Sequence, residues 1–168
     1  SLRDLLRKEI YFQNFSDLQL LELIEVGYRK RLLDGDILFK ENDPGDAFYI
    51  ILSGSIEVYV EKLDKHLATL EAGKFFGELA LMLGIPRSAS VRAVTDTVLF
   101  AINDKGFKNL LRENPDLYEI IVRELAKHQE ELTQRQDELR KLGLLDAKED
   151  EQNPVTWMRN RLKKLFCM

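Results

Sequence analysis

The stretch Phe76-Gly77-Glu78-Leu79-Ala80-Leu81, followed by Pro86-Arg87-Ser88-Ala89-Ser90, is the most informative part of this sequence. Helix formers follow a glycine, which predicts one or two helical turns between strands. A glycine at a helix start lets the backbone approach a ligand, and the free N–H groups there attract an anion. Glu78 could accept hydrogen bonds from a pair of hydroxyls, and Arg87 could pair with a phosphate. Together these features suit a sugar phosphate; the alternative is a solvated Glu78 and Arg87 beside core leucines.

Short apolar runs separated by turn residues surround this stretch, from Tyr28 to Ala101. Turn signals occur at Asp34-Gly35, at residues 42–46 and at Ser53-Gly54. After Gly54, apolar and polar residues alternate strictly from Ile56 to Val60, as in a strand with one buried face. Many short strands with turns about every ten residues predict a small barrel or jelly roll.

Helical patterns flank the predicted strands on both sides. Residues 1–25 repeat leucines at helical spacing, and Ser16 is a plausible N-cap within them. Residues 116–142 contain neither glycine nor proline, which predicts one long helix beginning near Pro115 and ending at Gly143. A last short helix is predicted from Asn153-Pro154 to Phe166. The predicted organisation is a helical segment at 1–25, a β-roll with C-terminal helices at 26–142, and an acidic linker with a basic amphipathic helix at 143–168.

The order of elements and the motifs resemble the cyclic nucleotide-binding domain family, of the catabolite activator protein and protein kinase A regulatory subunit type. The family pattern F-G-E-[LI]-A-L, then R-[ST]-A, is present in full at residues 76–81 and 87–89. Two upstream family patterns match at Gly35–Phe39 and Gly45–Ile50, and Gly54 matches the strand glycine. The resemblance covers about residues 5–142. It implies an α+β fold: an eight-stranded β-roll (a double-stranded β-helix jelly roll) with an N-terminal helix, a phosphate-binding cassette helix and C-terminal helices.

The resemblance also implies a role for each residue of the cassette. Glu78 would accept from the ribose 2′-hydroxyl, and Arg87 would bind the cyclic phosphate. The backbone N–H groups of Leu79 and Ala80 would complete the phosphate cradle, for which Gly77 leaves room. The other expected ligand contacts are Ser88 with the phosphate or purine, the small Ala89 against the ligand, and Val58 under the purine.

The expected ligand is cAMP or cGMP, and no metal is expected. Several family members that favour cGMP have threonine directly after the arginine, whereas this chain has Ser88, as in members that prefer cAMP. The sequence therefore favours cAMP over cGMP.

Other classes of function find little support in the sequence. Only His66 lies among the predicted strands, whereas a metal-dependent jelly-roll enzyme needs several histidines, so we expect no catalysis. The net charge of −4 gives no footprint for nucleic acid. Only 26 residues follow Leu142, too few for a winged helix-turn-helix. The single cysteine, Cys167, and the lack of long apolar runs predict a cytoplasmic chain in a reducing compartment.

The predicted long helix has an apolar seam with heptad spacing. Three interpretations stay open: a homo-oligomer through residues 116–142, a lid over the nucleotide that uses Leu125 and Leu132, or a helix half packed on the roll and half solvated. The seam positions are Ile121, Leu125, His128, Leu132, Arg135, Leu139 and Leu142.

The tail, residues 152–168, carries a charge of +4 and a helical apolar face with Trp157 at its edge. It could lie on an anionic membrane surface. We expect it instead to dock on its own chain and to cover apolar surface of the roll.

These patterns predict a cyclic-nucleotide sensor module that controls an effector. The chain begins with Ser1 rather than methionine, so we expect the effector to lie N-terminal to Ser1. The tail from Arg140 through Trp157 resembles cyanobacterial channels that couple a small-conductance mechanosensitive-type pore to a C-terminal domain of this kind. The alternatives are a soluble cytosolic regulatory protein and the truncated sensor half of a transcription activator.

Overall fold

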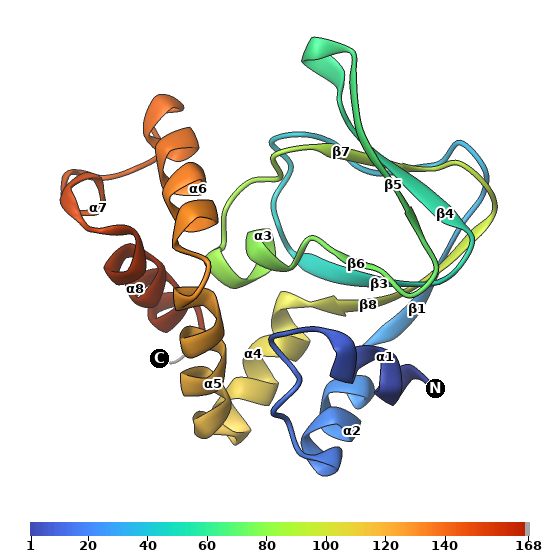
Figure 1. Ribbon diagram of the computed structural model, residues 1–168, viewed down its shortest axis with the longest axis horizontal. Coiled ribbons are helices and arrows are strands. Elements are labelled where there is room, and N and C mark those ends of the chain that lie inside the picture. The colour runs from blue at the N-terminus through green and yellow to red at the C-terminus, as the bar shows by residue number, and fades with distance from the viewer. Residues whose placement is uncertain (167–168) are drawn as a thin grey trace.

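The computed structural model describes residues 1–166, and Cys167 lies outside this range. The strands form a roll of two four-stranded antiparallel sheets on one side of the molecule (Figure 1). The first sheet has the order β1 (Tyr28–Leu32), β8 (Thr97–Asn103), β3 (Ala47–Ser53) and β6 (Phe75–Phe76). The second has the order β2 (Ile37–Phe39), β7 (Ser90–Ala93), β4 (Ser55–Val60) and β5 (Lys65–Glu71). The predicted eight-stranded β-roll is confirmed.

The alternation of residues along the strands explains the interior of the roll. One hydrophobic cluster fills the space between the sheets and includes Tyr49 and Ile51 of β3, Ile56 of β4 and Leu99 of β8. The intervening β3 residues Phe48 and Ile50 are also fully buried, but they belong to a second cluster with the helices. The unbroken apolar run of β3 therefore follows from helices that cover its outer face.

The N-terminal segment forms two short helices, α1 (Leu2–Lys8) and α2 (Asp17–Glu25), rather than one continuous helix. Ser16 begins α2 with a capping box, because its side chain accepts from Gln19 N–H and the Gln19 side chain accepts from Ser16 N–H. The predicted N-cap is confirmed.

The cassette segment forms the short helix α3 (Glu78–Leu83), bounded by Gly77 and Gly84. Figure 1 shows α3 between the roll and a layer of C-terminal helices. These helices are α4 (Asp104–Glu113), α5 (Pro115–Ala126), α6 (Gln129–Lys141), α7 (Ala147–Glu151) and α8 (Pro154–Phe166).

The prediction of one long helix over residues 116–142 is wrong, because the chain leaves the helix at Lys127 and His128. A straight helix of that length would extend about 40 Å, roughly twice the length of α8. The break lets both halves contact α8, and Leu125 of α5 and Leu132 of α6 are both fully buried. Burial of both leucines in one core explains the break better than local propensity does.

The tail docks on its own chain, as expected, but the surface it covers is helical. Helix α8 contacts α3, α4, α5 and α6. Trp157, predicted at the edge of the apolar face, is fully buried together with Met158 and Leu162. The clustered core runs from Leu6 to Phe166, so the terminal segments share it with the cassette.

This packing also changes the interpretation of the heptad seam. Ile121, Leu125, Leu132 and Leu139 are buried within the chain, whereas Leu142 is exposed. Except for Leu142, the apolar positions that suggested a homo-oligomer through residues 116–142 are therefore already covered by the chain itself. Within residues 1–166, none of the helices combines the length and hydrophobicity needed to cross a bilayer.

Candidate functional site

A cavity of about 140 Å³ lies at the N-terminal end of α3, between the roll and α6. It is lined by all eight predicted ligand-binding residues and by five that the prediction did not include. The predicted residues are Val58, Gly77, Glu78, Leu79, Ala80, Arg87, Ser88 and Ala89, and the additional residues are Phe39, Phe76, Val91, Glu131 and Arg135. The contiguous motif and the more distant β4 residue Val58 are thus brought to one place.

Gly77 is the residue that allows the chain to turn into α3. Its backbone has φ +85°, in the left-handed region that favours glycine. A Cβ atom at this position would lie 2.6 Å from Arg87 Nη1 and 3.3 Å from the Ala47 carbonyl oxygen. Glycine is therefore required both by the backbone angle and by the close approach of the Arg87 guanidinium.

Arg87 is buried, with 3% of its surface exposed. Its Nη1 donates to the Gly77 carbonyl oxygen at 3.2 Å and its Nη2 donates to the Ala47 carbonyl oxygen at 2.6 Å. The guanidinium carbon lies 4.1 Å from the centroid of the Phe39 ring, in cation–π contact. The carboxylate of Asp46 lies 3.8 Å from Nη2. Burial lowers the pKa of Arg87, although the group remains a cation.

Two buried polar atoms on the walls of the cavity have no partner among the described residues, namely Arg87 Nε and Glu78 Oε2. Buried polar atoms in proteins are almost always hydrogen-bonded. Burial raises the pKa of the Glu78 carboxyl, since a buried carboxylate loses hydration. An acceptor and a charged donor are therefore available on the walls of the same cavity.

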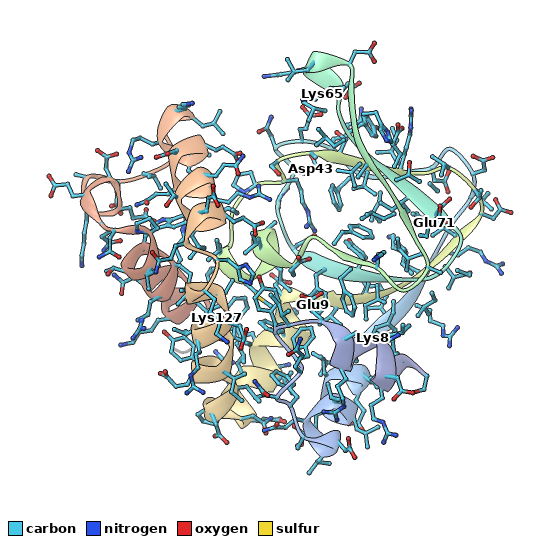
Figure 2. All side chains as sticks on the ribbon, viewed as in Figure 1. Lys8, Glu9, Asp43, Lys65, Glu71 and Lys127 are labelled. Carbon is cyan, nitrogen blue, oxygen red and sulfur yellow. The ribbon has the colours of Figure 1, made fainter. Side chains whose placement is uncertain are left out.

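The N-terminal segment adds a second acid near Glu78. Burial, together with the Glu78 charge, raises the pKa of Glu9 to about 7. Figure 2 shows Glu9 on the side of the N-terminal segment that faces α3. Nothing in the motif indicated this neighbour, because Glu9 lies about 70 positions away in the sequence.

The first N–H groups of α3 have no acceptor within the helix. Leu81 N–H is the first to donate in the helical pattern, to the Gly77 carbonyl oxygen. The N–H groups of Leu79 and Ala80 precede it and are among those that a helix leaves free. Both residues line the cavity.

Helix α6 closes the cavity with Glu131 and Arg135, which are one helical turn apart. Leu125 and Leu132, the residues expected to form an apolar lid, do not line the cavity, because both are fully buried in the core with the helices. The polar side of α6 borders the cavity instead. The sequence contained one indication of this wall: Arg135 is a charged residue at a position of the apolar seam, where a side chain facing a polar cavity can be accommodated.

The cyclic nucleotide-binding domain family model matches residues 29–114, about half of the chain. This chain belongs to the cyclic nucleotide-binding domain family. The matched region is a cyclic nucleotide-binding domain of the regulatory type.

Curated relatives include kinase proteins that respond to either nucleotide. A cAMP-dependent protein kinase regulatory subunit from Emericella nidulans is 35% identical over 114 residues, which are 62% of this chain and 28% of that protein. A cGMP-dependent protein kinase 2 from Mus musculus is 28% identical over 111 residues, 66% of this chain and 14% of that protein. The chain spans less than a third of the length of the relatives it matches.

Solved structures share the fold. The N-terminal domain of a transcriptional regulator from Streptomyces coelicolor A3(2) superimposes with a TM-score of 0.69 at 28% identity, covering 76% of this chain and 94% of that one. A structure of cAMP-bound PfPKA-R superimposes with a TM-score of 0.59 at 27% identity, covering 86% of this chain and 47% of that one.

Proposed function

We propose that the cavity at the N-terminal end of α3 binds cAMP, with Arg87 on the cyclic phosphate and Glu78 on the ribose 2′-hydroxyl. The observation that carries this proposal is the pair of buried atoms without partners, Glu78 Oε2 and Arg87 Nε, on the walls of the same cavity. A hydroxyl donor and an anionic acceptor would satisfy both atoms.

The other lining residues fit the shape and polarity of the same ligand. The N–H groups of Leu79 and Ala80 would donate to the phosphate, and Gly77 keeps the backbone close. Ala89 and Val58 are half-buried and offer small or apolar surface to the ligand. Ser88 is exposed and retains a hydroxyl that could reach the phosphate or purine.

We further propose a preference for cAMP over cGMP. The residue after Arg87 is serine rather than the threonine found in several members that favour cGMP. The relatives do not decide this point, because both cAMP-dependent and cGMP-dependent kinases are among them.

Nucleotide binding would require the cavity to widen. Its volume of about 140 Å³ is well below the roughly 300 Å³ at which ligand pockets usually begin. Glu131 and Arg135 form the wall contributed by α6, so this helix is the element expected to move. If α6 moves, the domain has a closed and a widened state, and the ligand binds the widened state more tightly. Regulation of an effector requires such a difference in affinity between two states.

The effector is also a proposal. The tail pattern from Arg140 through Trp157 favours an ion channel of the mechanosensitive type, with this domain on the cytoplasmic side. The second candidate is a soluble regulatory protein or the sensor part of a transcription activator. The structural match to the N-terminal domain of a transcriptional regulator supports the latter alternative. In each case this domain would regulate and would not catalyse.

The test combines one variant with one altered ligand. Calorimetric titrations would measure the affinity of wild type and Glu78→Gln for cAMP, cGMP and 2′-deoxy-cAMP. Wild type should bind cAMP more tightly than cGMP. Removal of the 2′-hydroxyl should cost wild type more affinity than it costs Glu78→Gln, because the variant lacks the charged acceptor.

The matched control is Glu71→Gln, an exposed position on β5 that does not line the cavity (Figure 2). It should behave as wild type with every ligand. Equal losses of affinity for 2′-deoxy-cAMP in wild type and Glu78→Gln would remove Glu78 from the hydroxyl contact. Absence of binding to either cyclic nucleotide by wild type would overturn the proposed function.

A further inference from the structure

A second cavity, of about 290 Å³, lies on the far side of α3 from the proposed nucleotide site. It is bordered by the C-terminal end of α3, by α7 and by α8. Its lining includes the polar residues Asp146, Lys148, Glu149, Gln152, Arg161 and Lys164. None of them lines the cavity at the N-terminal end of α3. The two cavities are therefore separate sites that share one short helix.

Two polar side chains of this second cavity each have a buried atom without a partner among residues 1–166. These atoms are Gln152 Oε1, an acceptor, and Arg161 Nη1, a charged donor. Among the described residues, the only other buried side-chain atoms without a hydrogen-bond partner belong to the proposed nucleotide site. Since buried polar atoms are normally hydrogen-bonded, the pair points to a ligand with both an anionic acceptor and a donor.

The Arg161 side chain and the backbone of Gln152 are held in place by other contacts. Arg161 Nε donates to Glu149 Oε2 at 3.3 Å, and the guanidinium lies 5.9 Å from the Trp157 ring centroid. The backbone of Gln152 is fixed because its carbonyl oxygen accepts from Gln136 Nε2 at 2.9 Å. The Arg161 guanidinium is therefore preorganised, and Gln152 is anchored at the cavity through its backbone.

The charges around the cavity favour an anion. The acids are already engaged: Asp146 caps α7 by accepting from Glu149 N–H, and Glu149 accepts from Trp157 Nε1 and Arg161 Nε. The described structure gives no ion pair for Lys148 or Lys164. With Arg161, the lining carries three cations against two acids, and both acids have partners.

We propose that this second cavity binds a small phosphate monoester that also carries a hydroxyl group. The phosphate would accept hydrogen bonds from Arg161 Nη1 and Lys164, and the hydroxyl would donate to Gln152 Oε1. A phosphate monoester carries nearly two negative charges and three acceptor oxygens, which matches several converging donors better than a carboxylate does. The volume approaches that of small-molecule pockets.

The shared helix gives this second site a route to the first. Leu83 and Gly84 end α3 beside the second cavity, and Gly77 and Glu78 begin it beside the first. A ligand that braces α8 against α3 would change how firmly α3, and with it Glu78, is held beside the first cavity. Coupling to cAMP rests on the proposed function, whereas binding of the phosphate monoester does not.

The direct test uses the full chain and glycerol 3-phosphate as the probe. Backbone amide NMR shifts should change on titration at residues 146–152 and 160–165, and not at residues 76–80. Glycerol, which lacks the phosphate, should cause no change, and inorganic phosphate, which lacks the alcohol hydroxyls, should bind more weakly. Shifts confined to residues 76–80, or none up to about 10 mM, would overturn the proposal.

A pair of neighbouring lysines provides a matched control. Lys164→Gln should weaken binding of glycerol 3-phosphate by about fivefold, the effect of one partly exposed charge contact. Lys163→Gln removes the same charge from the next residue, which is also exposed but does not line the cavity. It should change the affinity less than about twofold. Equal effects of the two variants would indicate general electrostatic attraction and would overturn the assigned site.

Coupling is measured separately, by titrating cAMP with and without saturating glycerol 3-phosphate. A changed cAMP affinity must be matched by an equal change in glycerol 3-phosphate affinity when cAMP is saturating. If cAMP fails to bind while glycerol 3-phosphate binds, the proposed function is wrong and the second site stands. If cAMP binds with an unchanged affinity, the coupling is wrong.

Discussion

The two ends of α3 are built in different ways. At the N-terminal end, the carbonyls of Gly77 and of Ala47 in β3 accept from the Arg87 guanidinium, so polar contacts fix the turn. At the C-terminal end, the nearest side chain to Gly84 is the apolar Leu165 of α8. The N-terminal end therefore depends on polar contacts between the cassette and β3, and the C-terminal end depends on a tail more than 70 residues further along the chain.

The two ends of α3 therefore contribute different properties: the N-terminal end contributes ligand specificity, and the C-terminal end contributes stability. Directional hydrogen bonds at the N-terminal end place one donor and one acceptor on the walls of a cavity, which suits recognition of a ligand. Packing against α8 at the other end is non-directional and contributes mainly to stability. Substitutions at the N-terminal end should thus change affinity, and substitutions behind the C-terminal end should change the free energy of unfolding.

The largest effect is expected behind the C-terminal end, at Trp157. Trp157→Ala should lower the free energy of unfolding by about 3–5 kcal/mol, because it removes a fully buried ring and its hydrogen bond to Glu149. Urea denaturation followed by circular dichroism would measure this loss. The control Thr156→Ala, at the adjacent exposed position, should change it by less than about 0.5 kcal/mol. Similar small losses in both variants would show that the tail contributes little to the core.

Arg87→Ala should have the next largest effect, on cAMP affinity. One charge-assisted hydrogen bond and an unpaired phosphate together cost about 2–3 kcal/mol, or roughly 30- to 150-fold in affinity. Calorimetry on the folded variant would measure it. The control Arg92→Ala removes an arginine of β7 that pairs with Glu57 and does not line the cavity. Unchanged cAMP affinity in Arg87→Ala would place the phosphate elsewhere.

The two glycines that bound α3 compare its ends directly. Gly77→Ala and Gly84→Ala should each cost about 1–2 kcal/mol of stability, because both backbones have positive φ. Only Gly77→Ala should also weaken cAMP binding, since its Cβ would displace the Arg87 guanidinium. At Gly84 the contacted group is the flexible end of Leu165, which can move. Equal cAMP affinities in the two variants would contradict the inference that only the N-terminal end of α3 contributes to ligand binding.

The smallest effect concerns Glu9 and the pH dependence of stability. The pKa of Glu9 is raised to about 7 in the folded protein, mainly by burial. The folded state thus holds this proton more tightly than the unfolded chain, and the resulting stability is lost as the pH rises from about 4.5 to 7. Glu9→Gln cannot lose a proton, so its melting temperature relative to wild type should rise between pH 5 and pH 8. The corresponding change in the free energy of unfolding should stay below about 1 kcal/mol, because Glu9 is partly exposed.

The control for this measurement is Glu25→Gln, an exposed position in the last turn of α2. Its melting temperature relative to wild type should be the same at both pH values. If the melting temperature of Glu9→Gln relative to wild type is also the same at pH 5 and pH 8, Glu9 is hydrated in the folded protein.

The sequence by itself determined the roll and the N-terminal end of α3. Strand alternation, turn residues and capping act over a few positions, so patterns such as Ile56 to Val60 and Ser16 to Gln19 are sufficient to predict the local structure. The cassette residues Gly77, Glu78 and Arg87 are only ten positions apart, and one helix start and one turn bring them together. Their motif therefore predicted which residues line the cavity.

Only the tertiary structure decided what closes the cavity and what supports α3 from behind. The break at Lys127 and His128 lies in a stretch with no glycine or proline, and it depends on the burial of Leu125 and Leu132 in one core. The same break directs Glu131 and Arg135 to the cavity. Apolar packing has no fixed partner in the sequence: a heptad seam fits a second chain or a helix of the same chain equally well. Which partner the seam packs against depends on the apolar area buried over the whole molecule, and the periodicity along the chain does not contain this information.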